Sequence, residues 1–202
     1  MIIETIVVGM METNCYIVGD ESTKEAFIID PGSDYKKIKN IIDKGGLKPQ
    51  AVINTHGHGD HIGANNNFDL PVWIHGADAE FLQDPSKNLS GALGFLLKTK
   101  AASRILKEGE VLTAGRVKLE VMHTPGHTPG SICLKGDSAI FTGDTLFCEG
   151  IGRTDLAYGS EEDILSSIKE KLFILPDDYA VYPGHGPCST IGHEKHNNPF
   201  IS

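Results

Sequence analysis

The segment that most constrains this chain is residues 55–61, which read Thr-His-Gly-His-Gly-Asp-His and place three imidazoles and one carboxylate within six positions. Burying so many polar groups is costly unless something satisfies them. His56 and His58 alternate along the segment, and Gly57 and Gly59 let the backbone turn tightly. Two pairs of side chains can therefore point toward two neighbouring places. The segment does not fit an ordinary apolar core.

Metal ions are the partners that this donor set favours. Imidazole nitrogen and carboxylate oxygen suit zinc, iron or manganese. The cysteines lie far apart and form no CxxC pair, so a structural zinc site built from thiolates is not indicated. We expect reduced thiols that serve packing at Cys15, Cys133, Cys148 and Cys188, although Cys148 follows a candidate ligand closely enough to lie near a pocket.

Three further candidate ligands share one setting, because each follows a predicted strand and is directly preceded by a glycine. They are His127, Asp144 and His185, after the predicted strands 117–122, 139–141 and 179–182. Loops at strand ends, aimed by a rigid sheet, commonly carry binding and catalytic residues. With the donors of residues 55–61 they make seven candidate ligands. Seven is enough for two metal ions with three or four protein ligands each and one carboxylate shared between them.

The rest of the chain predicts clusters of short strands with helices between them. Further strands are expected at 2–8, 15–18, 26–29, 51–53 and 71–74 in the first half, and at 132–134 in the second. One helix is expected to start after Ser33 as N-cap and to stop at Gly46, and another lies near 77–82. The clearest helix is capped by Ser160, carries an apolar stripe from Ile164 to Phe173 and ends at Pro176.

Residues 84–99 are too apolar for a plain solvated loop. We interpret them as a flexible helical segment that either covers a site or packs into the core. No linker or charge run marks a boundary elsewhere. We therefore expect one domain, residues 1–202, made of two β-rich halves, each faced by helices, in an α+β arrangement.

Composition excludes several classes of protein and partner. With 40% hydrophobic residues in 202 the chain is long enough to bury its own core. A net charge of −9 argues against binding along a nucleic-acid backbone. No apolar run approaches the ~18–20 residues of a membrane helix, and the first residues lack a basic region of the signal-peptide type. We expect a cytoplasmic protein without membrane or nucleic-acid partners; the sequence does not indicate its oligomeric state.

The compound motif resembles that of the metallo-β-lactamase superfamily. The matching features are the HxHxDH pattern of residues 56–61 followed in order by His127, Asp144 and His185, with Asp30 after the strand 27–29 as the first motif. The resemblance extends over most of the chain. It implies an αβ/βα four-layer sandwich, in which two mixed sheets lie between helical layers.

The resemblance also implies roles for individual residues. One metal would be held by His56, His58 and His127, the second by Asp60, His61 and His185, with Asp144 bridging and Asp30 orienting a ligand histidine. We expect two divalent ions, zinc first and iron or manganese as alternatives. His75, His123, His193 and His196 have no place in the pattern and are expected to be surface or structural residues.

Around the ligands, the segments 124–131, 142–147 and 182–187 look like those of short, single-domain bacterial relatives of glyoxalase II. Glyoxalase II is also called hydroxyacylglutathione hydrolase. This similarity implies a dinuclear-metal hydrolase that cleaves a small-molecule thioester of the S-lactoylglutathione type through a metal-bridging hydroxide. Asp60 is expected to hold or accept the proton of the nucleophilic water. We expect a single domain without the extra C-terminal helical domain of glyoxalase II, and arginine and aspartate stand where that enzyme has a lysine and a tyrosine for glutathione. Arg153 is expected either to bind a substrate carboxylate or to pair with Asp155.

The alternative hypothesis is that the chain is an oxidoreductase. The segment 152–156, Gly-Arg-Thr-Asp-Leu, also looks like that of the persulfide dioxygenases, which keep the same ligand set but bind a single iron. A β-lactamase is disfavoured because position 144 is aspartate rather than cysteine, and a flavo-diiron protein because position 58 is histidine rather than glutamate. A silent metal-binding fold would require the loss of a ligand, and none is missing.

Overall fold

The computed structural model describes residues 1–92 and 94–201. Its first sheet has six strands in sequential order. They are β1 (Ile2–Val8), β2 (Thr13–Gly19), β3 (Glu25–Ile29), β4 (Lys48–Ile53), β5 (Val72–His75) and β6 (Arg104–Leu106). β1, β2 and β3 form an antiparallel meander, whereas β3 to β6 run parallel. The sheet is therefore mixed, and its parallel part directs the ends of β3, β4 and β5 to one edge.

The second sheet also has six strands, in the order β14-β13-β10-β9-β8-β7. They are β7 (Val111–Ala114), β8 (Val117–His123), β9 (Ile132–Lys135), β10 (Ala139–Gly143), β13 (Ala180–Pro183) and β14 (Ser189–Thr190). Only the pair β10 and β13 is parallel; the other neighbours are antiparallel. A separate small hairpin joins β11 (Leu146–Phe147) to β12 (Gly150–Ile151).

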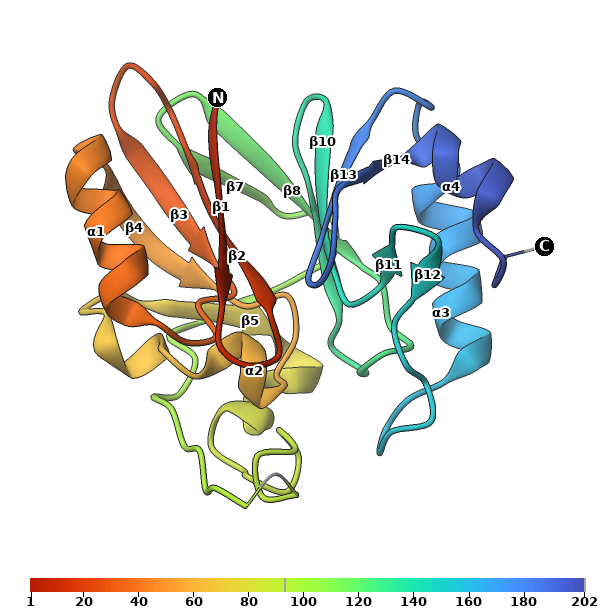
Figure 1. The fold of residues 1–202 in the computed structure, drawn as a ribbon, viewed down its shortest axis with the longest axis horizontal. Helices are drawn as coiled ribbons and strands as arrows, with labels where there is room; N and C mark the ends of the chain where they lie inside the picture. Colours follow the sequence, from red (N-terminus) through yellow and green to blue (C-terminus); the bar gives the residue numbers. More distant parts are fainter. Residues whose placement is uncertain (93, 202) are drawn as a thin grey trace.

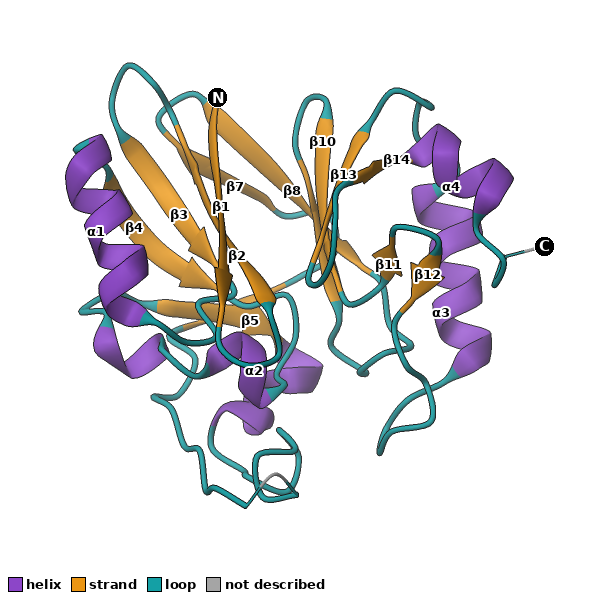
Figure 2. Ribbon diagram, in the orientation of Figure 1, coloured by secondary structure: helices purple, strands orange, loops and turns teal. Residues whose placement is uncertain are grey.

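Helices cover the outer faces of the two sheets (Figures 1 and 2). α1 (Tyr35–Gly45) lies on the first sheet, and α3 (Glu161–Ser167), its continuation η3 (Ile168–Leu172) and α4 (Ile191–Asn197) lie on the second. The short α2 (Gly59–Ile62), η1 (Asn65–Asn67) and η2 (Gly76–Leu82) lie near the ends of the first sheet's strands. The expected four-layer α+β sandwich with two mixed sheets is confirmed.

Three apolar clusters fill the three spaces between these four layers, because strand side chains alternate between the two faces of a sheet. In β3, Phe27 and Ile29 pack between the sheets, whereas Ala26 and Ile28 face the α1 side. The second sheet alternates in the same way, with Cys133 of β9 on the side of α3 and its neighbours between the sheets. The predicted packing role of Cys15 and Cys133 is thus confirmed, since both are fully buried. For Cys188 the prediction was wrong, because that residue is exposed.

Two details of the sequence interpretation were wrong. Ser33 does not cap α1; the cap position is Asp34, which has φ 50° and accepts the Gly9 N–H instead of a helix N–H. Residues 84–92 and 94–99 form no helix: residues 85–92 and 94 are turns and bends, and residues 95–99 have no regular secondary structure. The Asn88 Oδ1 accepts from both the N–H and the hydroxyl of Ser90, and such local side-chain bonds compete with helix formation.

Among the described residues, no helix is long and apolar enough to cross a membrane.

Candidate metal centre

Every candidate ligand lies in a loop or short helix at one end of the sandwich, between the two sheets. The first sheet contributes the loop after β4 with α2, and the second contributes the loops after β8, β10 and β13. These carry, in order, His56, His58, Asp60 and His61, then His127, Asp144 and His185. The structure thus brings together all seven residues that the sequence singled out.

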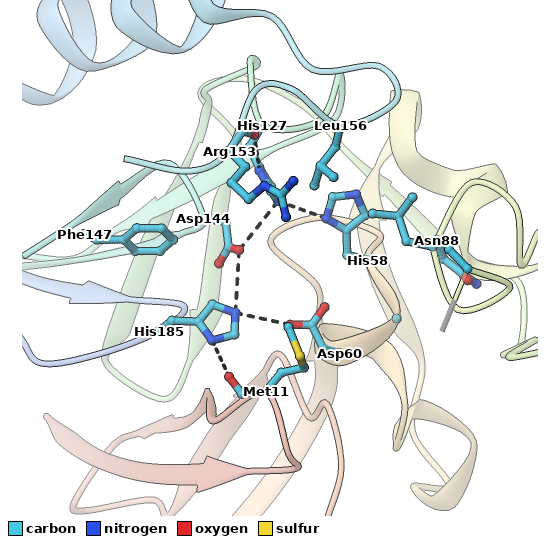
Figure 3. A pocket seen from close by; sticks show the side chains of 13 residues that line it. Met11, His58, Asp60, Asn88, His127, Asp144, Phe147, Arg153, Leu156 and His185 are labelled. Carbon is cyan, nitrogen blue, oxygen red and sulfur yellow. Dashed lines mark hydrogen bonds and ion pairs between the residues drawn. The ribbon is translucent and has the colours of Figure 1, made fainter. Parts of the chain in front are cut away.

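Three imidazoles form the first group, in which the ligand atoms of His56, His58 and His127 lie within 4.8 Å of one another. Nδ1 of His58 is 2.9 Å from Nε2 of His127, as Figure 3 shows. All three side chains are buried. Three convergent imidazole nitrogens with no thiolate are a ligand set suited to a divalent cation with an open coordination position.

A second group joins Asp60, His61 and His185. Nε2 of His61 lies 3.3 Å from Nε2 of His185, and Oδ2 of Asp60 lies 3.2 Å from the latter atom. Asp144 stands between the groups: its Oδ1 is 3.3 Å from Nε2 of His61, and its Oδ2 is 3.6 Å from Nε2 of His127. A carboxylate in that position can serve both groups.

The fit to metal ions rests on buried atoms that lack hydrogen-bond partners. Among the described residues, His56 Nε2, His58 Nε2 and Asp144 Oδ1 are buried side-chain atoms without one. Leaving buried polar atoms unpaired is costly, and native structures rarely do it without a reason. His56 and Asp144 belong to the candidate ligand groups, so a cation bound at each group would supply the missing partners there.

Electrostatics in the centre favour neutral imidazoles at His56 and His58. Burial, followed by the neighbouring imidazoles, holds the pKa of His56 well below its usual value, and burial with His127 lowers the pKa of His58 to about 3. Burial alone would lower the pKa of His61 as well, but the Asp144, Asp60 and Asp30 carboxylates outweigh it and raise that pKa. Neutral imidazole is the form that binds a metal.

The far side of the imidazoles is held by groups from other loops. Asp30, after β3, accepts from the N–H and hydroxyl of Thr55 at 2.8 and 2.6 Å and from His61 Nδ1 at 3.0 Å. This is the orienting contact that the resemblance implied. His185 Nδ1 donates to the carbonyl oxygen of Met11 at 2.9 Å. Such partners fix ring orientation and tautomer.

Sequence reasoning missed the contribution of the first residues of β2, because nothing local marks it. The hydroxyl of Thr13 donates to Asp60 Oδ2 at 3.2 Å, and Asn14 holds the His185 loop through the carbonyl oxygens of Pro183 and Gly186. The buried Asp78 of η2 was missed as well.

The glycine that directly precedes His185 is required because no side chain would fit at that position. A Cβ on Gly184 would lie 2.1 Å from Asp144 Oδ1 and 2.8 Å from His61 Cε1. Only a residue without a side chain lets the backbone approach the centre so closely.

The centre opens into a cavity of about 430 Å³ with largely apolar walls. Its lining beyond the candidate ligands and Gly59 comprises Met11, Asn88, Leu89, Ala92, Phe147, Arg153 and Leu156 (Figure 3 shows most of them). Residues from the segment 84–99 thus form one wall, and Leu97 of the same segment packs against the first core cluster. The Arg153 guanidinium is exposed and forms a two-point ion pair with Asp155, with both N–O distances 2.9 Å.

Outside the cavity, Cys148, His193 and Glu194 also bring potential ligand atoms within 4.8 Å of one another. The Glu194 carboxylate already accepts from the Glu149 N–H and the Asn198 side-chain amide, which anchors α4 to the β11–β12 hairpin. Its hydrogen bonds therefore explain its burial. Neither Cys148 nor any of the four histidines left out of the pattern lines the cavity.

Two mixed sheets between helices, with a buried centre of imidazoles and carboxylates where loops of both sheets meet, define a metallo-hydrolase architecture. The chain belongs to the metallo-beta-lactamase superfamily, whose family model matches residues 8–185. This family implies binding of divalent metal.

One curated protein and two solved structures are similar to this chain over almost its whole length. The hydroxyacylglutathione hydrolase GloC of Haemophilus influenzae is 37% identical over 210 residues, covering 100% of this chain and 99% of that protein. The crystal structure of BLEG-1 B3 metallo-beta-lactamase has a TM-score of 0.95 and 39% identity over 100% of both chains. That of ETHE1 from Myxococcus xanthus has a TM-score of 0.80 and 29% identity, covering 98% of this chain and 84% of the other.

Proposed function

We propose that this metal-dependent hydrolase cleaves small-molecule thioesters of the S-lactoylglutathione type. In this proposal one divalent cation is held by His56, His58 and His127, a second by Asp60, His61 and His185, and Asp144 is shared. Zinc is the expected ion, with iron or manganese as alternatives. The observation that carries the proposal is the convergence of all seven donors in one centre that contains unpartnered buried atoms.

The chemistry of hydrolysis fits the residues around the centre. Two divalent cations, when bound there, would activate a water near neutral pH and polarise a carbonyl group. Asp60 lines the cavity, and Thr13 and His185 hold its Oδ2 in place. We assign Asp60 to hold or accept the proton of the attacking water. If the Asp60→Asn variant kept both metals and full turnover, Asp60 would not have that role.

A thioester suits this cavity because its leaving group needs little help. A thiolate departs without a strong general acid, and the cavity walls beyond the candidate ligands supply none: they are apolar side chains, Asn88 and Arg153. Arg153 is the cation on the rim, and we assign it to a carboxylate of the substrate. The hydroxyacylglutathione hydrolase named among the relatives supports this substrate class.

The second candidate is a persulfide dioxygenase with a single iron. It is favoured by the segment 152–156 and by the similarity to ETHE1. The same ligand set serves both candidates, so metal stoichiometry and products must separate them.

One set of assays on the purified chain tests the proposal. Metal per chain is measured together with hydrolysis of S-D-lactoylglutathione, oxygen uptake with glutathione persulfide, and hydrolysis of a cephalosporin as a third substrate. Two metals per chain with thioester cleavage, abolished in the Asp144→Ala variant, support the proposal. One iron with oxygen consumption, or cephalosporin turnover without thioester cleavage, overturns it.

A further inference from the structure

Asp78 is a buried carboxylate with no role in the ligand set. Its side chain is fully buried on η2, and its oxygens accept three hydrogen bonds. Oδ2 accepts from the Gly57 N–H at 2.8 Å and from the Thr128 hydroxyl at 2.7 Å, and Oδ1 accepts from the Gly130 N–H at 2.7 Å. A buried carboxylate is costly, and three hydrogen bonds are what offsets that cost.

All three donors lie in loops that carry the first group of imidazoles. Gly57 sits between His56 and His58, and Thr128 directly follows His127. These loops belong to different sheets, so one side chain holds both of them. Contact is close enough that a Cβ on Gly130 would lie 2.5 Å from Asp78 Oδ1.

The second group is held by different residues. His61 is oriented by Asp30, and His185 by the carbonyl oxygen of Met11. None of the hydrogen bonds of Asp78 reaches those residues. A change at Asp78 should therefore act on one group of ligands and spare the other.

We propose that Asp78 is a positioning residue that brings the loop of His56 and His58 and the loop of His127 into the geometry of one cation site. It sets the affinity of that site through Gly57, Thr128 and Gly130 without touching the cation. The proposal rests on the ligand assignment made under Proposed function.

Single-site backgrounds make the proposal testable. His185→Ala weakens the second group and leaves the first, whereas His127→Ala does the reverse. Cobalt(II) binding is followed by its visible absorption in each background, with and without Asp78→Asn. Loss of such an outer partner typically costs about 10–100-fold in metal affinity. We expect that loss in the His185→Ala background and a change within about twofold in the His127→Ala background.

The matched control is Asp20→Asn. Asp20 is likewise buried and accepts from main-chain N–H groups of Ser22 and Arg116, but it lies outside the cavity of the centre. We expect it to lower the midpoint of urea unfolding without changing cobalt affinity in either background. Equal weakening by Asp78→Asn in both backgrounds, or in neither, overturns the proposal.

A milder pair of variants covers the case in which Asp78→Asn does not fold. Thr128→Val removes one donor to Asp78, and Thr128→Ser restores it. Cobalt affinity of the first group should fall in the Val variant and recover in the Ser variant; unchanged affinity in the Val variant overturns the proposal. If the wild-type chain binds two cations but cleaves no thioester, only the proposed substrate fails. If it binds none, the ligand assignment and the role of Asp78 fail together.

Discussion

Nδ1 of His127 lies 2.8 Å from the main-chain carbonyl oxygen of Arg153. Because a carbonyl oxygen only accepts, the imidazole donates there and leaves the lone pair of Nε2 facing the centre. The side chain of the same arginine lies at the cavity rim, paired with Asp155. One residue therefore supports a ligand through its backbone and faces the substrate cavity through its guanidinium.

Replacing Arg153 by Ala should separate these two contributions. The carbonyl oxygen is retained, so metal content should not change. The Michaelis constant for a thioester that carries a carboxylate should rise by about two- to fivefold, because an exposed ion pair contributes at most about 1 kcal/mol. Steady-state kinetics with metal analysis checks both statements. Loss of metal, or an unchanged Michaelis constant, would contradict the assignment.

Removing the Asp30 carboxylate should damage both folding and metal binding. Asp30→Ala leaves the two Thr55 donors and His61 Nδ1 without their buried acceptor. We expect the free energy of unfolding of the metal-free chain to fall by about 3–5 kcal/mol. Zinc affinity should fall by about 10–100-fold. Urea unfolding and zinc competition measure the two effects, and a variant with wild-type values in both would show that the contact is dispensable.

A side chain at position 184 should be incompatible with the centre. Gly184→Ala places a methyl group where Asp144 Oδ1 and His61 now lie, and displacements of this size cost about 100-fold in rate. The control is Gly136→Ala, whose new Cβ would meet its nearest neighbour at an ordinary 3.4 Å. We expect kcat/KM to collapse in the first variant and to stay near wild type in the second. Equal activities would mean that the backbone there can yield.

Stability should depend on pH through His75, whose ring stacks on that of His123 with 4.0 Å between centroids. Burial, then the charge of His123, lowers the pKa of His75 to about 4. Between about pH 4 and pH 6.5 the unfolded chain binds more protons at this group than the folded chain, so stability falls as the pH falls. The ring is half-buried, and solvent screening reduces the expected loss to about 1 kcal/mol.

His75→Asn tests this dependence, because Asn keeps an acceptor for the Ala77 N–H that caps η2 but does not titrate. Urea unfolding in the presence of a chelator, from pH 7 to pH 4, should show a smaller loss in the variant than in the wild type. Parallel curves would place the pH dependence elsewhere.

The sequence predicted the long elements and the seven candidate ligands because both leave local patterns. Alternating apolar residues mark strands such as β8, and Ser160 caps α3 as expected, with its hydroxyl accepting from the Asp163 N–H. The short strands β6, β7, β11, β12 and β14, of two to four residues, were not predicted, since pairing with a neighbour defines them more than their own residues do.

The orienting residues found only in the structure have a different cause. Asp78 bonds to Thr128 across 50 positions, and His185 to Met11 across 174. No pattern within one segment of the sequence predicts such a pair. Long-range contacts of this kind appear only when the two sheets have been placed against each other.

The split of the donors between the halves of the chain bears on how the protein assembles. Neither half carries a complete group: His56 and His58 need His127, and Asp60 and His61 need His185, which follows His61 by 124 positions. A cation at either group would therefore cross-link the two sheets at their loop end. Tight capture of metal would have to wait until the halves have docked, and the bound ions would then resist their separation.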